Sequence, residues 1–131
     1  MIFVHSPSAA AGGLDRHALE AGMAIPDDAL WIDLLEPTRT EDLLVEAFLK
    51  VSIPTREEML DLEPSEIIYT EDEARYMTAR VICHSDTEHP RLTPLSFILT
   101  ERALVTVRYD EPRALATVSY THLTLPTNRE V

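Results

Sequence analysis

Carboxylate side chains at helical spacing are the residues of this sequence best suited to chemistry. Glu57, Glu58 and Asp61 lie close together, and a separation of four places Glu57 and Asp61 on one face of a helix. Such oxygen ligands suit a hard divalent cation that retains part of its water shell. They equally suit a solvated helix surface near the positive end of the helix dipole. Asp42 and Glu46 repeat the spacing earlier in the chain, and a solvated surface is the simpler interpretation of both pairs.

Two other groups of residues could also support chemistry. Cys83, His84, Asp86 and His89 offer zinc-type ligand atoms, but their order matches no structural zinc motif, so we interpret them as a buried cysteine followed by loop histidines. Asp33 interrupts an apolar run, where a buried acid could be catalytic, although hydrogen bonding to a neighbouring loop or helix cap is the commoner role. The sequence has no nucleophile elbow and no phosphate-binding loop, so we predict no catalytic residue and no organic cofactor.

The charge of the chain is concentrated in one region. The 131 residues suit one domain with a net charge of -12, and the segment from Asp27 to Glu73 holds 15 acidic and 3 basic residues, which is the whole excess. Such a surface repels phosphate backbones and attracts cations, so nucleic acid is not an expected partner. The single cysteine excludes an internal disulfide, and no apolar run is long enough to span a bilayer, so the sequence itself predicts a soluble cytoplasmic domain.

Two helix starts position these carboxylates. Thr38 precedes Glu41 by three residues, and Thr55 precedes Glu58 by three, which is the spacing of a capping box. Pro64 is expected to end the second helix. The side chains expected to face inward are Leu44, Val45, Phe48, Leu49 and Val51 in the first helix region and Met59, Leu60 and Leu62 in the second.

The remaining elements are predicted to be mostly strands. A short strand at residues 2–5 precedes a central strand at 29–35, which is apolar on both faces around Asp33. Two hairpins follow, with tips at residues 71–73 and 100–102 and strands at 66–70, 74–84, 93–100 and 103–109. Residues 15–21 favour a weak helix, and another helix is expected to open at Asp110.

Four segments in this order resemble the amino-terminal cytoplasmic domain of CorA-type magnesium transporters. They are residues 31–38 (WIDLLEPT), 53–59 (IPTREEM), 76–79 (YMTA) and 94–109, and the similarity covers roughly residues 29–113. The resemblance implies an α/β (α+β) fold, with a mixed sheet flanked by helices. It also implies that residues 1–118 form an incomplete domain, without the stalk and transmembrane helices of the family. Residues 119–131 resemble a translated sequencing adapter, so we interpret them as a non-native tail.

The resemblance also implies a function. The family forms homopentameric channels in the cell inner membrane, so the expected role is a regulatory, cation-sensing domain on the cytoplasmic side rather than an enzyme. The expected partners are other copies of the chain, divalent cations, and the membrane through the absent helices. Mg²⁺ is the expected transported and regulatory ion. The alternatives are a zinc-transporting relative and a stand-alone acidic metal-dependent hydrolase or interaction domain.

The resemblance places one regulatory carboxylate on the second helix, where this sequence departs from the family. A gapless comparison puts Met59 at the acidic position. We therefore predict Glu58 as the first ligand of a regulatory divalent cation, Asp61 as the second, and Glu57 as a further candidate.

Overall fold

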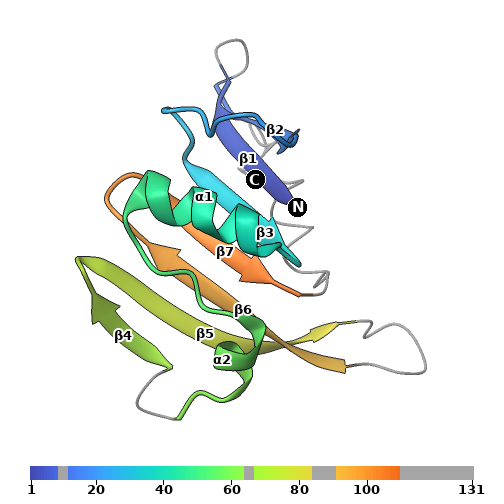
Figure 1. The fold of residues 1–131 in the computed structure, drawn as a ribbon, viewed down its shortest axis with the longest axis vertical. Coiled ribbons are helices and arrows are strands. Elements are labelled where there is room, and N and C mark those ends of the chain that lie inside the picture. Colours follow the sequence, from blue (N-terminus) through green and yellow to red (C-terminus); the bar gives the residue numbers. More distant parts are fainter. Residues whose placement is uncertain (9–11, 64–66, 84–90, 110–131) are drawn as a thin grey trace, which may run out of the picture.

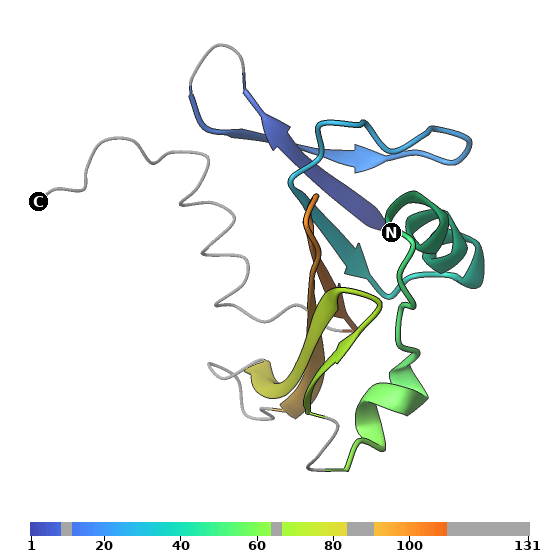
Figure 2. The ribbon, with the colours of Figure 1, turned by 90° about the vertical axis from the view of Figure 1, so that its left-hand side faces the viewer.

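A computed structural model describes residues 1–8, 12–63, 67–83 and 91–109 of the chain. Its centre is a mixed seven-stranded sheet in the order β2-β1-β3-β7-β6-β5-β4, with two helices on one face (Figures 1 and 2). All neighbouring strands are antiparallel except β3 and β7, which are parallel. The strands are β1 (Ile2–Pro7), β2 (Leu14–Leu19), β3 (Trp31–Leu35), β4 (Ile68–Glu71), β5 (Ala74–Cys83), β6 (Arg91–Leu99) and β7 (Leu104–Arg108), and the helices are α1 (Arg39–Leu49) and α2 (Arg56–Leu60).

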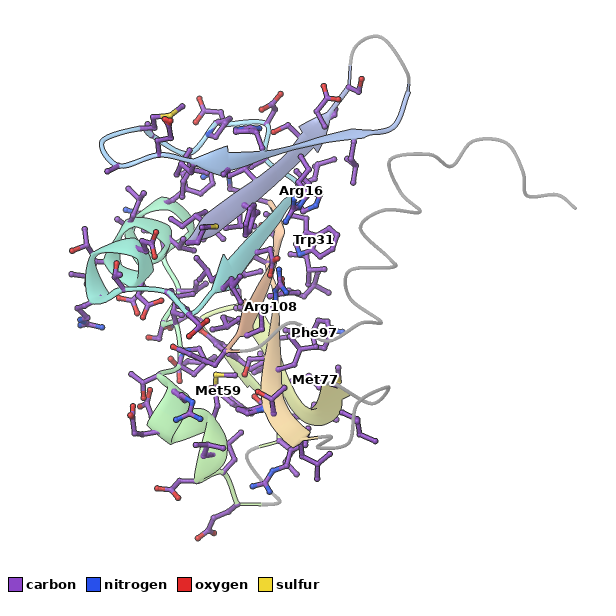
Figure 3. All side chains as sticks on the ribbon, turned by 90° about the vertical axis from the view of Figure 1, so that its right-hand side faces the viewer. Arg16, Trp31, Met59, Met77, Phe97 and Arg108 are labelled. Carbon is purple, nitrogen blue, oxygen red and sulfur yellow. The ribbon has the colours of Figure 1, made fainter. Side chains whose placement is uncertain are left out.

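The strand register separates two unlike faces of the sheet. The row facing the helices consists of Tyr69, Tyr76, Ile98, Val105, Ile32 and Val4, which belong to or pack against the core. The neighbouring row on the other face consists of Ile68, Met77, Phe97, Thr106, Asp33 and Phe3. Figure 3 shows Met59 on the helix side and Met77, Phe97 and Arg108 on the opposite side of the sheet.

Both helices begin where the capping boxes predict. The Thr38 hydroxyl accepts a hydrogen bond from the Glu41 amide while the Glu41 carboxylate accepts one from the Thr38 amide, and Thr55 with Glu58 repeats this arrangement. These bonds satisfy amides that have no partner within the helix. The prediction of two capped helices is therefore confirmed, although α2 ends at Leu60, before Pro64.

The predicted inward faces of the helices were partly wrong. Val45, Leu49 and Met59 are buried, but Leu44 is 37% exposed and Leu60 is 39% exposed. Asp42, expected at the solvated surface, is only 5% exposed. Apolar residues span more than half of the circumference of α1, so apolarity alone did not define which way the helix is rotated on the sheet.

Residues 14–19 form an edge strand, β2, and not the weak helix expected from residue 15. β2 pairs antiparallel with β1 from Leu14 opposite Pro7 to Leu19 opposite Ile2. A helix this short has few hydrogen bonds to offset its nucleation cost, whereas the free edge of β1 supplies partners for the backbone. Tertiary pairing therefore overrides a weak local preference.

The other predicted strands and both hairpins are confirmed, with shifts of one to two residues at most ends. Three predictions lie outside the described residues: the helix opening at Asp110, the tail at 119–131, and the part of the zinc-type cluster that follows Cys83.

The tip of the β4–β5 hairpin is locally strained. Asp72 and Glu73 both have positive φ, 50° and 67°, between the paired residues Glu71 and Ala74. Two-residue turns of this kind favour glycine because a side chain crowds the backbone at positive φ. Glu73→Gly should therefore raise the free energy of unfolding by about 0.5–1 kcal/mol, measured by urea denaturation.

The control for this variant is Glu101→Gly at the β6–β7 turn, where φ is not positive. That change should lower stability, because glycine there only adds freedom to the unfolded chain. Equal effects of the two variants would contradict the assignment of strain to Glu73.

Candidate functional site

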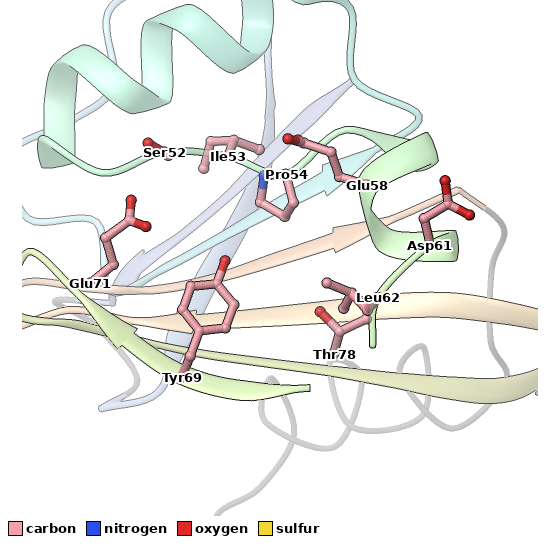
Figure 4. A pocket seen from close by; sticks show the side chains of 9 residues that line it. All are labelled: Ser52, Ile53, Pro54, Glu58, Asp61, Leu62, Tyr69, Glu71 and Thr78. Carbon is pink, nitrogen blue, oxygen red and sulfur yellow. The ribbon is translucent and has the colours of Figure 1, made fainter. Parts of the chain in front are cut away.

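A pocket of about 670 Å³ lies between α2, the segment that precedes it, and the β4–β5 hairpin (Figure 4). The described residues that line it are Ser52, Ile53, Pro54, Glu58, Asp61, Leu62, Tyr69, Glu71 and Thr78. Its charged lining is entirely acidic among these residues, with two carboxylates from α2 and its end and one from β4. The pocket therefore combines negative charge with an apolar surface.

The structure brings two of the three predicted ligands together. Glu58 and Asp61 both line the pocket, whereas Glu57 is exposed and does not. Met59, at the position where the family resemblance implies an acid, is 2% exposed and belongs to the hydrophobic core. Met59 therefore anchors α2 to the sheet, and the carboxylates on either side of it remain available to solvent.

The segment between the helices, which forms one wall of the pocket, is held by side chains from α1 and β5. The Tyr76 hydroxyl donates to the Ser52 carbonyl over 2.9 Å and accepts from the Ser52 amide over 3.1 Å. The Glu46 carboxylate accepts a hydrogen bond from the Ile53 amide over 2.8 Å. Burial of Tyr76 raises the pKa of its phenol, so it stays protonated and able to donate at neutral pH. Glu46 thus has a structural role on a helix surface that the sequence assigned to solvent.

Glu71 is a pocket residue that the sequence did not identify. The sequence assigned it to a solvated hairpin tip, but Glu71 is the last residue of β4 and shares a face with Tyr69, two residues earlier. Tyr69 stacks on Tyr76 with ring centroids 4.7 Å apart, which fixes this face towards the helices. The hairpin register, once known, would have predicted the orientation of Glu71.

A buried acid, Asp42, lies on α1 outside the described lining of the pocket. Burial raises the pKa of Asp42 to about 6, the Glu46 carboxylate adds to the shift, and Arg39 opposes it. Asp42 Oδ1 accepts no hydrogen bond among the described residues. Burial also raises the pKa of Tyr109 to about 12, with a contribution from the negative charge of Asp42. The ionised Asp42 side chain therefore lowers the stability of the folded state at neutral pH.

Asp33, the catalytic candidate of the sequence, forms a buried ion pair. Its carboxylate accepts hydrogen bonds from Arg108 Nε and Nη2, the shortest 2.7 Å, and from Thr106 Oγ1 over 2.8 Å. Trp31 Nε1 donates in turn to Thr106 Oγ1 over 2.9 Å. The partners of Asp33 come from the parallel neighbour β7, and not from the loop or helix cap that the sequence favoured. This arrangement is typical of a structural role.

The described residues do not form a complete metal site by themselves. Among the described residues, no three His, Cys, Asp or Glu side chains lie close enough to hold a metal ion. Glu58 is also partly engaged, because its Oε1 accepts the capping hydrogen bond from the Thr55 amide over 2.8 Å. A cation at Glu58 and Asp61 would complete its coordination with water or with groups from another chain.

Known proteins similar to this chain were found by sequence and by fold. The magnesium transport protein CorA of Escherichia coli K12 is 30% identical over 84 residues, and that of Salmonella typhimurium is 29% identical, in both cases over 64% of this chain. The soluble domain of CorA from Methanocaldococcus jannaschii superimposes with a TM-score of 0.55 at 17% identity, over 77% of this chain and 39% of that one. The described residues have the fold of the CorA soluble domain.

The similar proteins are longer than this chain. The complete CorA structure from Methanocaldococcus jannaschii matches the chain with a TM-score of 0.57 at 15% identity, over 40% of its own length. The chain spans 27% of the length of the curated relatives it matches. No family model matches the chain. None of the described helices has the length and apolar character needed to cross a membrane.

Proposed function

We propose that this CorA-type domain is the cytoplasmic cation sensor of a magnesium transporter that assembles as a homopentameric channel in the cell inner membrane. The observation that carries this proposal is the pocket in which Glu58 and Asp61 lie together beside the buried Met59. Its support is the similarity to proteins named as magnesium transporters, which does not favour the zinc-transporting or hydrolase alternatives. In this role the domain catalyses no reaction.

The proposed mechanism depends on the position of the charge. Glu58 and Asp61 belong to the acidic region that holds the whole net charge of the chain, so neighbouring copies that present this region to one another would repel. Mg²⁺ bound by the two carboxylates, with retained water and a group from the neighbouring copy, would remove that repulsion. Because the ion binds the closed arrangement more tightly, falling Mg²⁺ would shift the population towards the open one.

The test is Mg²⁺ titration of the 131-residue chain by calorimetry and by amide NMR shifts. The double variant Glu58→Gln, Asp61→Asn should weaken Mg²⁺ binding by about tenfold, since two carboxylate contacts are lost. Glutamine and asparagine keep the side-chain shapes, and the carbonyl oxygen of a glutamine side chain can still accept the capping hydrogen bond from the Thr55 amide.

The matched control is Glu20→Gln, which removes one exposed carboxylate just beyond β2, outside the described lining of the pocket. It should leave Mg²⁺ affinity unchanged. Equal affinities of the wild-type chain and the double variant would refute the proposed site.

A further inference from the structure

The carboxylates of the pocket are spread along it and do not converge on a point. Figure 4 shows Glu58 and Asp61 at the α2 end and Glu71 at the far end, with Tyr69 between them. No three of the described acidic side chains are close enough to share one metal ion. A single small cation can therefore contact one end of the pocket only.

The charged groups in the described lining of the pocket are all acidic, and Arg80, which donates to the Leu60 carbonyl over 3.3 Å, lies outside that lining. No Lys, Arg or His is among the described residues that line it. Neither Asp61 nor Glu71 forms an ion pair with a described residue. Elsewhere on the surface, Asp27 does pair with a cation, Arg102, over 4.0 Å. A ligand with positive charge at both ends would complement this distribution.

The space between the two charged ends is large and is lined in part by apolar side chains. Ile53, Pro54, Leu62 and Tyr69 line it. A volume of about 670 Å³ corresponds to about 20 waters at about 30 Å³ each, several times the water that a hydrated metal ion carries. The parallel stacking of Tyr69 on Tyr76, with 2° between the rings, holds this surface in place. The pocket can therefore bury methylene groups as well as bind charge.

We propose that this pocket binds a linear organic di- or triamine. One ammonium group pairs with Glu71, another pairs with Asp61 and Glu58, and the methylene chain between them covers Leu62 and Tyr69. The inference rests on the cation-binding role proposed above for Glu58 and Asp61, and extends it to an organic cation that also uses Glu71. Such an amine would compete with Mg²⁺ at the α2 end of the pocket.

Calorimetric titration of the 131-residue chain with butylamine, putrescine and spermidine tests the proposal at low ionic strength. Spermidine should bind at least about tenfold more tightly than butylamine, because it engages both ends of the pocket. Glu71→Gln should weaken spermidine binding by about two- to fivefold while leaving Mg²⁺ affinity unchanged. Asp61→Asn should weaken both ligands, and Glu20→Gln neither.

The outcomes separate this inference from the proposed function. Weaker binding of both Mg²⁺ and spermidine in the Glu58→Gln, Asp61→Asn variant, with Glu71→Gln weakening spermidine alone, supports both. Spermidine binding that depends on Glu71 in a chain that binds no Mg²⁺ would support the amine site and refute the metal sensor. Spermidine affinity that is the same in Glu71→Gln and in Glu20→Gln would show general attraction to an acidic surface, and would overturn the amine site whatever the Mg²⁺ result.

Discussion

Asp33→Ala should lower the free energy of unfolding by about 3–5 kcal/mol, the largest effect expected of a single substitution in this domain. Asp33 and Arg108 are both buried, with side-chain exposures of 3% and 4%, and their closest atoms are 2.7 Å apart. Removing the carboxylate breaks the ion pair of a guanidinium group buried in the sheet, and the Thr106 hydroxyl loses its acceptor. Because small domains are stable by only about 5–15 kcal/mol, the variant should be largely unfolded at moderate urea.

The measurement is urea denaturation followed by the fluorescence of Trp31, the only tryptophan in the chain. The indole reports directly on this region, because its Nε1 donates to Thr106, which donates to Asp33. The matched control is Asp27→Ala, which breaks a surface ion pair with Arg102 at 4.0 Å. The side chain of Asp27 is fully exposed. That control should leave the urea midpoint unchanged. A similar midpoint for both variants would show that the buried pair contributes no more than a surface contact.

Asp42→Asn should stabilise the domain at neutral pH and not at acidic pH. Burial raises the pKa of Asp42 from 3.8 to about 6, so the folded state binds this proton more tightly than the unfolded state does. The stability of the wild type therefore falls as pH rises from about 4 to about 6, and the whole cost is present above that range. A pKa change of this size corresponds to about 3 kcal/mol, and we expect about 1–2 kcal/mol because partly exposed neighbouring charges are screened by solvent.

The experiment compares urea midpoints of the wild type and Asp42→Asn at about pH 3.5 and about pH 7.5, below the ordinary pKa and above the raised one. The two proteins should be similar in stability at the lower pH, where Asp42 is largely protonated in both the folded and the unfolded state, and the variant should be more stable at the higher pH. Asp28→Asn, at an exposed turn position, should change neither midpoint. A difference between wild type and Asp42→Asn that is the same at both pH values would show that the effect does not come from ionisation.

The sequence predicted the local elements well because their causes are local. Thr38 and Thr55 determine where the helices begin, since a capping box needs only four consecutive residues. The apolar run around Asp33 predicted a central strand, and β3 lies in the interior of the sheet between β1 and β7. β-branched residues and the alternation of apolar with polar residues predicted the two hairpins, because this pattern also relates residues that are close in sequence.

The candidate site was predictable only in part. The α2 carboxylates Glu58 and Asp61 were found because helical spacing relates neighbours in sequence. Glu71 was missed because its contribution depends on how β4 registers with β5 and how that hairpin lies against α2. A pocket that joins segments distant in sequence leaves no periodic pattern in either of them.

The sequence by itself determined where the helices start, which segments form most of the β-strands, and that one region carries all of the net negative charge. Only the tertiary structure decided that Asp42 faces the core, that residues 14–19 complete the edge of the sheet, that Asp33 pairs with Arg108, and that Glu71 faces the α2 carboxylates. The physical reason is that caps and turns are satisfied by residues a few positions apart. Burial, ion pairing and strand register depend instead on which distant surfaces come together, and that depends on the packing of the whole domain.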